Sequence, residues 1–302
     1  MSFKRYGRLV FYMVLRSTPV AVKIFLLFWA LGGNEISSLL GHSNLVVPHP
    51  QRITGKLPNG ISYTFLPNDK PENRLSLRLI VATGAFMEKD REDGLAHFIE
   101  HMAFNGSVHF PSGSLIKYFQ RIGMGFGNDT NAATSLTHTV YKLELPGCSE
   151  EEIRQGFTVL TDYAHGVLFP AEEIDRERGV ILSELRTRDT PQHRIGKEQM
   201  KFLFPHHLLS KRFVIGTTDT LNGFRREDFL SFYKRWYTSD RMHLVAVGPV
   251  NPDKLLQQMK ESFGALPSSK SRKDPPMGKI TRPKGRPVGI WNEPELTHAT
   301  IE

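Results

Sequence analysis

Four short segments rich in β-branched and aromatic residues constrain the fold of this chain more than any other feature. They cover residues 61–66, 75–84, 137–146 and 242–248. Each is closed by a glycine or a proline, and this combination predicts β-strands. Amphipathic helical patterns lie between them, at about 94–104, 112–123, 150–168, 171–188, 193–203, 225–237 and 252–264. Because the strands are grouped with helices and do not strictly alternate with them, an α+β layer is favoured over a doubly wound sheet.

One helix start can be predicted from a capping residue. In the segment 112–123, Leu115, Phe119 and Ile122 share one face of a helix. Ser112 stands just before this periodic stretch, where a hydroxyl can accept a hydrogen bond from a free backbone N–H. We therefore expect Ser112 to cap this helix.

The composition indicates a globular protein with a sizeable core. Hydrophobic residues make up 39% of the 302 residues, enough for one large domain or for one domain and part of another. The single cysteine, Cys148, excludes an internal disulfide. No motif surrounds Cys148, so we expect a small buried or half-buried side chain and not a catalytic thiol.

The start of the chain has the features of an export signal. Five lysine and arginine residues precede the first acidic residue, Glu35, and the apolar stretch 24–31 is followed by two glycines. This order predicts a secretory signal peptide over residues 1–34, and hence a periplasmic or other extracytoplasmic location. The alternative is a retained membrane anchor, but Lys23 interrupts the apolar stretch, which falls short of the roughly 20 residues of a membrane span.

The formal charge of +8 does not indicate a nucleic-acid partner. Without the five basic residues of the leader the charge falls to about +3, which is unremarkable. The basic residues are also not interleaved with aromatic side chains, as they are in many nucleic-acid-binding proteins. We therefore expect no nucleic-acid partner.

The composition changes at residue 267. Residues 267–287 hold seven lysines and arginines, five prolines and one aspartate. Such a segment is typical of a solvated linker, and binding of an acidic partner is the alternative. Residues 288–302 begin a new strand-like segment and stop, so they are interpreted as the start of a second, truncated domain. Residues 45–266 would then form the first domain.

Two histidines and a glutamate stand within five positions at His97-Phe98-Ile99-Glu100-His101. On a helix, His97 and His101 share a face one turn apart, and Glu100 lies near the same edge. Two neutral imidazoles suit Zn²⁺, and a nearby carboxylate can take a proton from a metal-bound water. The order is that of the H-x-x-E-H zinc peptidase signature. The alternative is a core helix whose histidines are satisfied by hydrogen bonds.

A catalytic zinc site needs a third protein ligand, and the helical segment 171–188 offers two acidic residues for it. Glu177 and Glu184 are seven positions apart, two helical turns, so both lie on one face. Either could reach a metal held by a neighbouring helix. Without the histidine motif, a charged surface stripe would be the better interpretation of this segment.

In combination, these segments resemble the M16 family of zinc metallopeptidases, which includes pitrilysin, insulin-degrading enzyme and the mitochondrial processing peptidase. The resemblance runs from about Leu57 to Leu266 and involves four stretches in the family's order. They are GLAHFIEHMAFNGS (the inverted zinc motif), NAATSLTHTVY at 131–141 (an edge strand), ERGVILSE (the second glutamate helix) and FYKRWYTSDRMHLVAVGPVNPDKL (the end of the first repeat). It implies an α+β domain with a mixed, mostly antiparallel sheet packed with helices.

The resemblance also implies roles for the acidic and imidazole side chains. His97 and His101 would be zinc ligands, and Glu184 would be the third ligand of one Zn²⁺ per chain. Glu100 would be the general base. Glu177 matches an additional glutamate of the family that supports the catalytic site from behind the ligands.

A substrate-binding strand is implied as well. Asn131 and Ala132 match the segment to which an extended peptide would add as a further strand. The segment from Ser107 to Gly127 departs from the family pattern, because it is several residues longer than in compact bacterial members. This puts the geometry of that loop in doubt, but not the ligands.

The resemblance implies a zinc-dependent endopeptidase that hydrolyses peptides or unfolded polypeptides. Glu100 would accept a proton from the zinc-activated water and pass it to the leaving amine. The alternative is a catalytically idle M16-like partner or scaffold subunit, but a scaffold would not need the four residues His97, Glu100, His101 and Glu184. Family members enclose substrate between two halves, so a second M16-like half or subunit is an expected partner. The leader would be the point of any membrane contact.

Overall fold

The computed structural model describes residues 48–268, 273–281 and 288–289. The predicted signal peptide, part of the predicted linker and nearly all of the predicted second domain lie outside these residues. The chain divides into two compact units, Met1–Pro50 and Gln51–Glu302, and the fold described below is that of the second unit. Within the described residues, no helix combines the length and the apolar character required of a membrane span.

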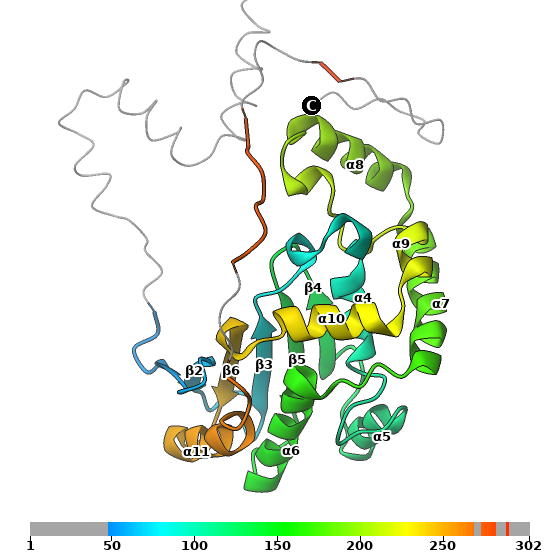
Figure 1. The fold of residues 1–302 in the computed structure, drawn as a ribbon. Coiled ribbons are helices and arrows are strands. Elements are labelled where there is room, and N and C mark those ends of the chain that lie inside the picture. Colours follow the sequence, from blue (N-terminus) through cyan, green and yellow to red (C-terminus); the bar gives the residue numbers. More distant parts are fainter. Residues whose placement is uncertain (1–47, 269–272, 282–287, 290–302) are drawn as a thin grey trace, which may run out of the picture. The chain divides into compact units, whose positions relative to one another are not determined.

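A six-stranded sheet forms the centre of this unit (Figure 1), with the strand order β1-β2-β6-β3-β5-β4. The strands are β1 (Ile53–Lys56), β2 (Ser62–Pro67), β3 (Leu75–Val81), β4 (Thr130–Thr134), β5 (Thr139–Leu145) and β6 (Met242–Gly248). Only β2 and β6 pair in parallel, and the other neighbours are antiparallel. The predicted α+β class with a mixed, mostly antiparallel sheet is therefore confirmed.

Helices cover one face of this sheet, and every second side chain of the central strands is buried. In β3, β5 and β6 buried and half-buried positions alternate without a break, as the two-residue period of a strand requires. Figure 1 shows α6 and α10 in front of the strands and α7 beside α4. The helices are α4 (Leu95–Met102), α5 (Ser114–Arg121), α6 (Glu150–Thr161), α7 (Ala171–Arg188), α8 (Pro191–Leu203), α9 (Thr218–Gly223), α10 (Arg226–Trp236) and α11 (Pro252–Phe263).

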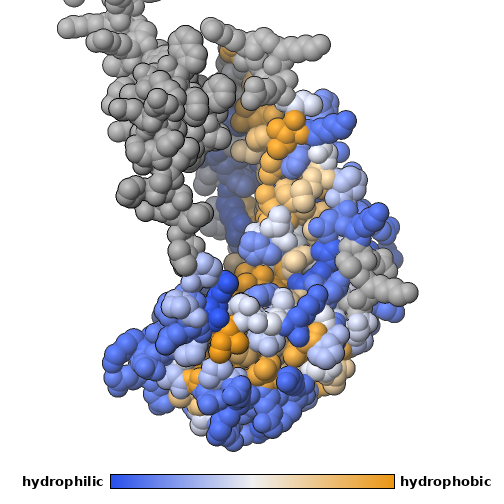
Figure 2. Space-filling model, turned by 90° about the vertical axis from the view of Figure 1, so that its left-hand side faces the viewer, coloured by the Kyte–Doolittle hydropathy of each residue, from blue (hydrophilic) through white to orange (hydrophobic). Residues whose placement is uncertain are grey.

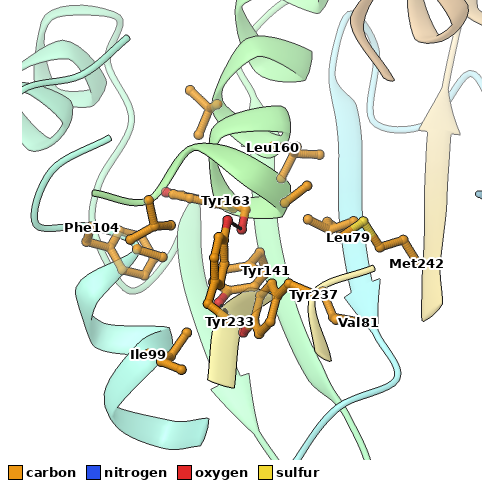
Figure 3. Packing of buried hydrophobic residues seen from close by; sticks show 14 of the residues in the cluster. Leu79, Val81, Ile99, Phe104, Tyr141, Leu160, Tyr163, Tyr233, Tyr237 and Met242 are labelled. Atoms are coloured by element: carbon orange, nitrogen blue, oxygen red, sulfur yellow. Dashed lines mark hydrogen bonds between the residues drawn. The ribbon is translucent and has the colours of Figure 1, made fainter. Parts of the chain in front are cut away.

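The core between sheet and helices contains a cluster of tyrosines (Figure 3). Tyr141 of β5 stacks near Tyr163, and its hydroxyl lies 2.8 Å from the hydroxyl of Tyr237. The Tyr233 hydroxyl donates to the backbone oxygen of Tyr163 at 2.8 Å. The hydroxyl of a buried tyrosine needs a hydrogen-bond partner. These bonds therefore allow tyrosine side chains to pack between the sheet, α10 and the turn after α6.

The four predicted strands are present, but two strands were not recognised from their composition. β1 is short, and β4 has the sequence TNAAT, which is weak in β-branched and aromatic residues. The segment 131–141 is also more than one strand. It forms a hairpin in which β4 turns back at residues 135–138 into β5.

The predicted cap at Ser112 is wrong. The helix α5 begins at Ser114, after Gly113, whose φ of 72° lies in the left-handed region, and no side chain caps it. The Ser112 hydroxyl donates instead to Glu173 of α7 at 2.6 Å. A hydrogen bond to a charged carboxylate is stronger than one from a backbone N–H to a neutral hydroxyl. The tertiary contact with Glu173 therefore overrides the local capping pattern.

Part of the predicted linker lies against the body of the unit. Leu208 N donates to Met277 O at 2.8 Å, and Lys279 N donates to His206 O at 3.1 Å. Gly278 sits between these bonds with a φ of 88°, and a Cβ at this position would lie 2.0 Å from His206 O. The backbone of residues 277–279 therefore follows a path that a glycine makes possible, while all of residues 273–281 except the half-buried Pro275 are exposed.

Two glycines set the position of α4. Gly94 precedes the helix with a φ of 93°, and an added Cβ would lie 2.8 Å from the Cα of Gly216. Gly216 likewise has a positive φ, and its added Cβ would meet the backbone oxygen of Asp93 at 2.5 Å. The two backbones can approach this closely only because neither residue has a side chain.

We predict that Gly94→Ala destabilises the protein more than Gly113→Ala. Both changes place a β-carbon at positive φ, which costs about 1–2 kcal/mol. Only Gly94→Ala also forces two backbones apart, because nothing lies within 4 Å of a Cβ at Gly113. Overpacking adds about 1–3 kcal/mol. Urea unfolding of the two variants measures the difference, and equal destabilisation would show that the glycine contact does not hold α4.

Candidate active site

The helix α4 carries the histidine motif and is almost entirely buried. Seven of its eight residues are buried, and His101 is half-buried. Its apolar side packs through Phe98, whose ring lies 4.8 Å from that of Phe229 in α10. Its other side brings His97, Glu100 and His101 to the base of a cavity. Apolar packing thus fixes which way the polar side chains point.

A remote carboxylate caps the start of α4. Gly94 offers no side chain for this purpose, and the Glu88 carboxylate accepts hydrogen bonds from Gly94 N at 3.1 Å and from Ala96 N at 2.8 Å. Burial raises the pKa of Glu88 well above its usual value, although these backbone bonds act against the rise. The cap satisfies N–H groups that the first turn of a helix leaves free.

The two imidazoles and a carboxylate of α7 converge on one point. His97 Nε2 lies 3.3 Å from His101 Nε2, and Glu184 Oε2 lies 3.7 Å from the first and 3.6 Å from the second. The three side chains form the one group of at least three potential ligands found among the described residues. The predicted ligand set is therefore brought together by two helices.

These distances fit a zinc ion. Ligand atoms placed about 2.0–2.1 Å from a tetrahedral ion lie about 3.3–3.4 Å from one another. The observed separations of 3.3, 3.6 and 3.7 Å depart from that value by only a few tenths of an ångström. Two histidine nitrogens and one glutamate oxygen are a known ligand set of catalytic zinc, with a fourth position left for water or substrate. The residues present thus fit the metal that the motif suggests.

His97 is held in the neutral form that a metal ligand requires. Burial lowers its pKa to about 3, and the nearby His101 and Arg188 act in the same direction. Its second ring nitrogen, Nδ1, is buried without a hydrogen-bond partner among the described residues. A neutral imidazole keeps a lone pair for coordination.

His101 is oriented by Glu177, the first of the two glutamates on α7. Its Nδ1 lies 2.7 Å from Glu177 Oε1, and Asn105 donates to the other oxygen of that carboxylate at 2.9 Å. Burial lowers the pKa of His101, but the bond to Glu177 together with the negative charges of Glu100, Glu177 and Glu184 outweighs burial and raises it. Burial would raise the pKa of Glu177, but the same bond lowers it. An Nδ1–H donated to Glu177 leaves Nε2 as the coordinating atom.

Glu100 lies beside the ligands and bonds to the strand β4. The Thr134 hydroxyl donates to Glu100 Oε2 at 2.7 Å. Burial raises the pKa of Glu100, and the bond from Thr134 limits the rise. Such a rise brings the pKa of a carboxyl group closer to neutral pH, which favours general acid–base catalysis.

These side chains line one cavity of about 700 Å³. The edge strand β4 forms one wall, and both predicted substrate-binding residues, Asn131 and Ala132, line it. The lining consists of His97, Glu100, His101, Phe104, Asn105, Ile116, Phe126, Asn131, Ala132, Ala133, Thr134, Glu177, Glu184, Arg188 and Val214. All predicted site residues thus lie in a single cavity.

Sequence reasoning missed four residues of the site or its supports. Asn105 stands four positions after His101, and this spacing predicts that the two side chains lie on the same side of the helix. Arg188 stands four positions after Glu184 in the same way. Glu88 and Thr134 carry no local signal, because their contacts with α4 depend on tertiary structure.

Two models of known protein domains match this chain. The model of insulinase, peptidase family M16, matches residues 63–202, and the model of the M16 inactive domain matches residues 223–301. The first match contains both helices of the site. The chain belongs to the M16 peptidase family. The two matches follow one another along the chain.

Several relatives within this family are described as zinc proteases. The probable zinc protease PqqL of Escherichia coli is 34% identical over 219 residues, which are 72% of this chain and 24% of PqqL. The chloroplastic stromal processing peptidase of Pisum sativum is 32% identical over 240 residues, 78% of this chain and 18% of that protein. The crystal structure of the first half of the periplasmic protease PqqL matches with a TM-score of 0.72 and 32% identity, covering 77% of this chain and 49% of that one. This chain thus spans about a quarter or less of these full-length relatives.

We predict that Glu177→Gln weakens zinc binding about 10- to 100-fold, as is usual when the partner of a ligating histidine is changed. An amide cannot accept from His101 Nδ1 with the strength of a carboxylate. Glu172→Gln is the matched control, because Glu172 is exposed on the same helix and outside the cavity. Zinc affinity is measured by competition with a chelator. Equal affinities of the two variants would contradict the role given to Glu177.

We further predict that the metal-free protein loses stability as the pH falls from about 6.5 to about 3. Over this range His97 takes up a proton in the unfolded chain but remains neutral in the fold, where burial holds its pKa at about 3. The unfolded state then binds more protons, so the free energy of unfolding decreases with falling pH. Urea unfolding as a function of pH should show a shallower slope for His97→Gln. An unchanged slope would contradict the prediction.

Proposed function

We propose that this protein is a zinc-dependent endopeptidase that hydrolyses peptides or unfolded polypeptides. The observation that carries the proposal is the approach of His97 Nε2, His101 Nε2 and Glu184 Oε2 to within 3.7 Å of one another at the base of a cavity. These three residues would hold one zinc ion per chain. Zinc supplies Lewis acidity for a peptide carbonyl and lowers the pKa of a bound water.

Glu100 is the proposed general base. Its carboxylate would accept the proton of the attacking water and then donate it to the leaving amine. Thr134 would hold one of its oxygens, leaving the other for this proton transfer. Glu177 would keep His101 in the tautomer with a proton on Nδ1, and so contribute to catalysis through a ligand.

The edge strand β4 is the proposed substrate site. Within the described sheet its one partner is β5, so its outer edge is available to an extended peptide. The backbone N–H of Ala132 donates to the side-chain oxygen of Asn131 at 2.9 Å. A substrate carbonyl could replace that oxygen. Main-chain pairing of this kind recognises extended peptides with little dependence on their sequence.

An exported protein with a second half is the proposed setting. The match to a periplasmic protease supports export. It also supports a second half, because this chain covers 49% of a structure that is itself the first half of that protease. Hydrophobic residues also gather in patches on the face drawn in Figure 2. Such patches are typical of surfaces that contact other protein segments. A nucleic-acid partner is not part of the proposal, and the residues for export or membrane contact lie outside the described chain.

A catalytically idle partner subunit is the competing proposal. An idle subunit has no need of a proton acceptor beside the ligands, yet Glu100 is buried there at a cost in desolvation. The bond from Thr134 holds Glu100 and involves none of the three proposed zinc ligands. The set of side chains favours the active enzyme.

We predict that Glu100→Gln retains zinc and loses about 10²–10⁴-fold in peptide hydrolysis, the usual contribution of a positioned base. Glu172→Gln should keep both properties. Zinc content is measured after dialysis, and hydrolysis with an unstructured reporter peptide. Hydrolysis by Glu100→Gln at the wild-type rate would overturn the role of Glu100. A wild-type protein that binds zinc and cleaves no peptide would favour the idle subunit.

A further inference from the structure

Arg188 is a charged residue of the cavity to which the proposed reaction gives no role. It stands one helical turn after Glu184 on α7 and lines the same cavity. Its side chain is 47% exposed, while that of Glu184 is 28% exposed. Arg188 thus lies on the solvent side of the metal ligand, where an incoming substrate would pass.

Most hydrogen-bonding capacity of Arg188 is unused in the described part of the chain. A guanidinium has five N–H donors in a planar fork. Here Nη2 donates to Glu184 Oε1 at 2.5 Å, and the guanidinium makes no other hydrogen bond with described residues. The remaining donors can bind an anionic group without releasing Glu184.

The other charged groups of the cavity are already engaged. Glu177 is bonded by His101 and Asn105, and Glu100 is bonded by Thr134. Apart from the two histidines, Arg188 is the one basic residue of the cavity lining. Among the charged side chains of the lining, the carboxylates would repel an anionic substrate side chain and Arg188 would attract it.

The position of Arg188 limits which substrate residue it can reach. One oxygen of Glu184 lies within 3.7 Å of both imidazoles, and the other binds Arg188. A single carboxylate therefore separates the guanidinium from the position that a zinc ion would take between the ligands. An extended peptide advances about 3.3–3.5 Å per residue. The residue that Arg188 meets must therefore be close to the bond that is cleaved.

We propose that Arg188 determines specificity by binding the carboxylate of an aspartate or glutamate one to three residues from the scissile bond. The preferred substrates are then peptides with an acidic residue next to the cleavage site. The inference rests on the proposed peptidase function and deepens it. Arginine suits this task because its fork can hold a carboxylate through two parallel hydrogen bonds.

A double-mutant cycle between enzyme and peptide tests the inference. Reporter peptides of one unstructured sequence carry a single glutamate, or glutamine in its place, at each of three positions on either side of the cleaved bond. Hydrolysis is compared for the wild-type protein, Arg188→Gln and the control Arg186→Gln. Arg186 is exposed on the same helix and does not line the cavity, so both variants lose the same charge.

At one of the positions, the wild type should cleave the glutamate peptide with a kcat/KM about tenfold above that of the glutamine peptide, as expected for one charged hydrogen-bonded pair. Arg188→Gln should abolish this preference, so that the glutamate and glutamine peptides are cleaved with similar kcat/KM. Arg186→Gln should keep the preference. Arg188→Lys should retain part of it, because an ammonium offers charge without the fork.

Three results would overturn the inference. The first is no preference for glutamate at any position, and the second is a preference that survives Arg188→Gln. The third is a loss of zinc affinity in Arg188→Gln of more than about tenfold by chelator competition, which would assign Arg188 to holding Glu184. In the first two results the glutamine peptides are still cleaved, so the proposed function stands. If zinc-loaded wild-type protein cleaves no peptide, the proposed function fails and the inference fails with it.

Discussion

The burial of polar side chains on α4 is the constraint on which the site depends. Removing an imidazole and a carboxylate from water is costly unless each finds a partner. His97 is 5% exposed and Glu100 is 7% exposed, in a helix otherwise surrounded by apolar residues. Neighbouring elements compensate for this cost. Thr134 of β4 bonds Glu100, Glu177 of α7 bonds His101, and Glu184 approaches both rings. The position of one helix therefore depends on a strand and a second helix at once.

The second helix is fixed just as strongly. Glu177 and Glu184 are two turns apart on α7, and Ile181 stands between them on the same side with no exposed surface. Because this apolar side chain is packed into the core, α7 cannot rotate about its axis without exposing it. Rotation would also carry both carboxylates away from the imidazoles. Core packing and ligand geometry thus favour the same orientation of the helix.

Much of this arrangement could be predicted from the sequence, since it depends on local periodicity. The spacing of His97 and His101 and that of Glu177 and Glu184 follow from 3.6 residues per turn. The central strands were recognisable because their alternate residues are apolar. Hydrogen-bond partners from other segments of the chain could not be recognised in the sequence. Glu88 caps a helix eight residues away across a turn, and the Ser112 hydroxyl binds Glu173 instead of its own helix. Such contacts depend on which segments the fold brings side by side, which no window of sequence records.

The place of β6 in the sheet bears on the order in which this protein can acquire its structure. β6 is the last strand of the sheet in sequence, yet it lies between β2 and β3 and pairs with both. Until residue 248 has left the ribosome, the first two strands have no neighbour linking them to the rest, and the sheet beneath the two helices is split. Pairings of such long sequence separation form late and slowly. This late closure would suit the export proposed above, because a secretion channel that accepts only unfolded polypeptide would have time to engage the open chain.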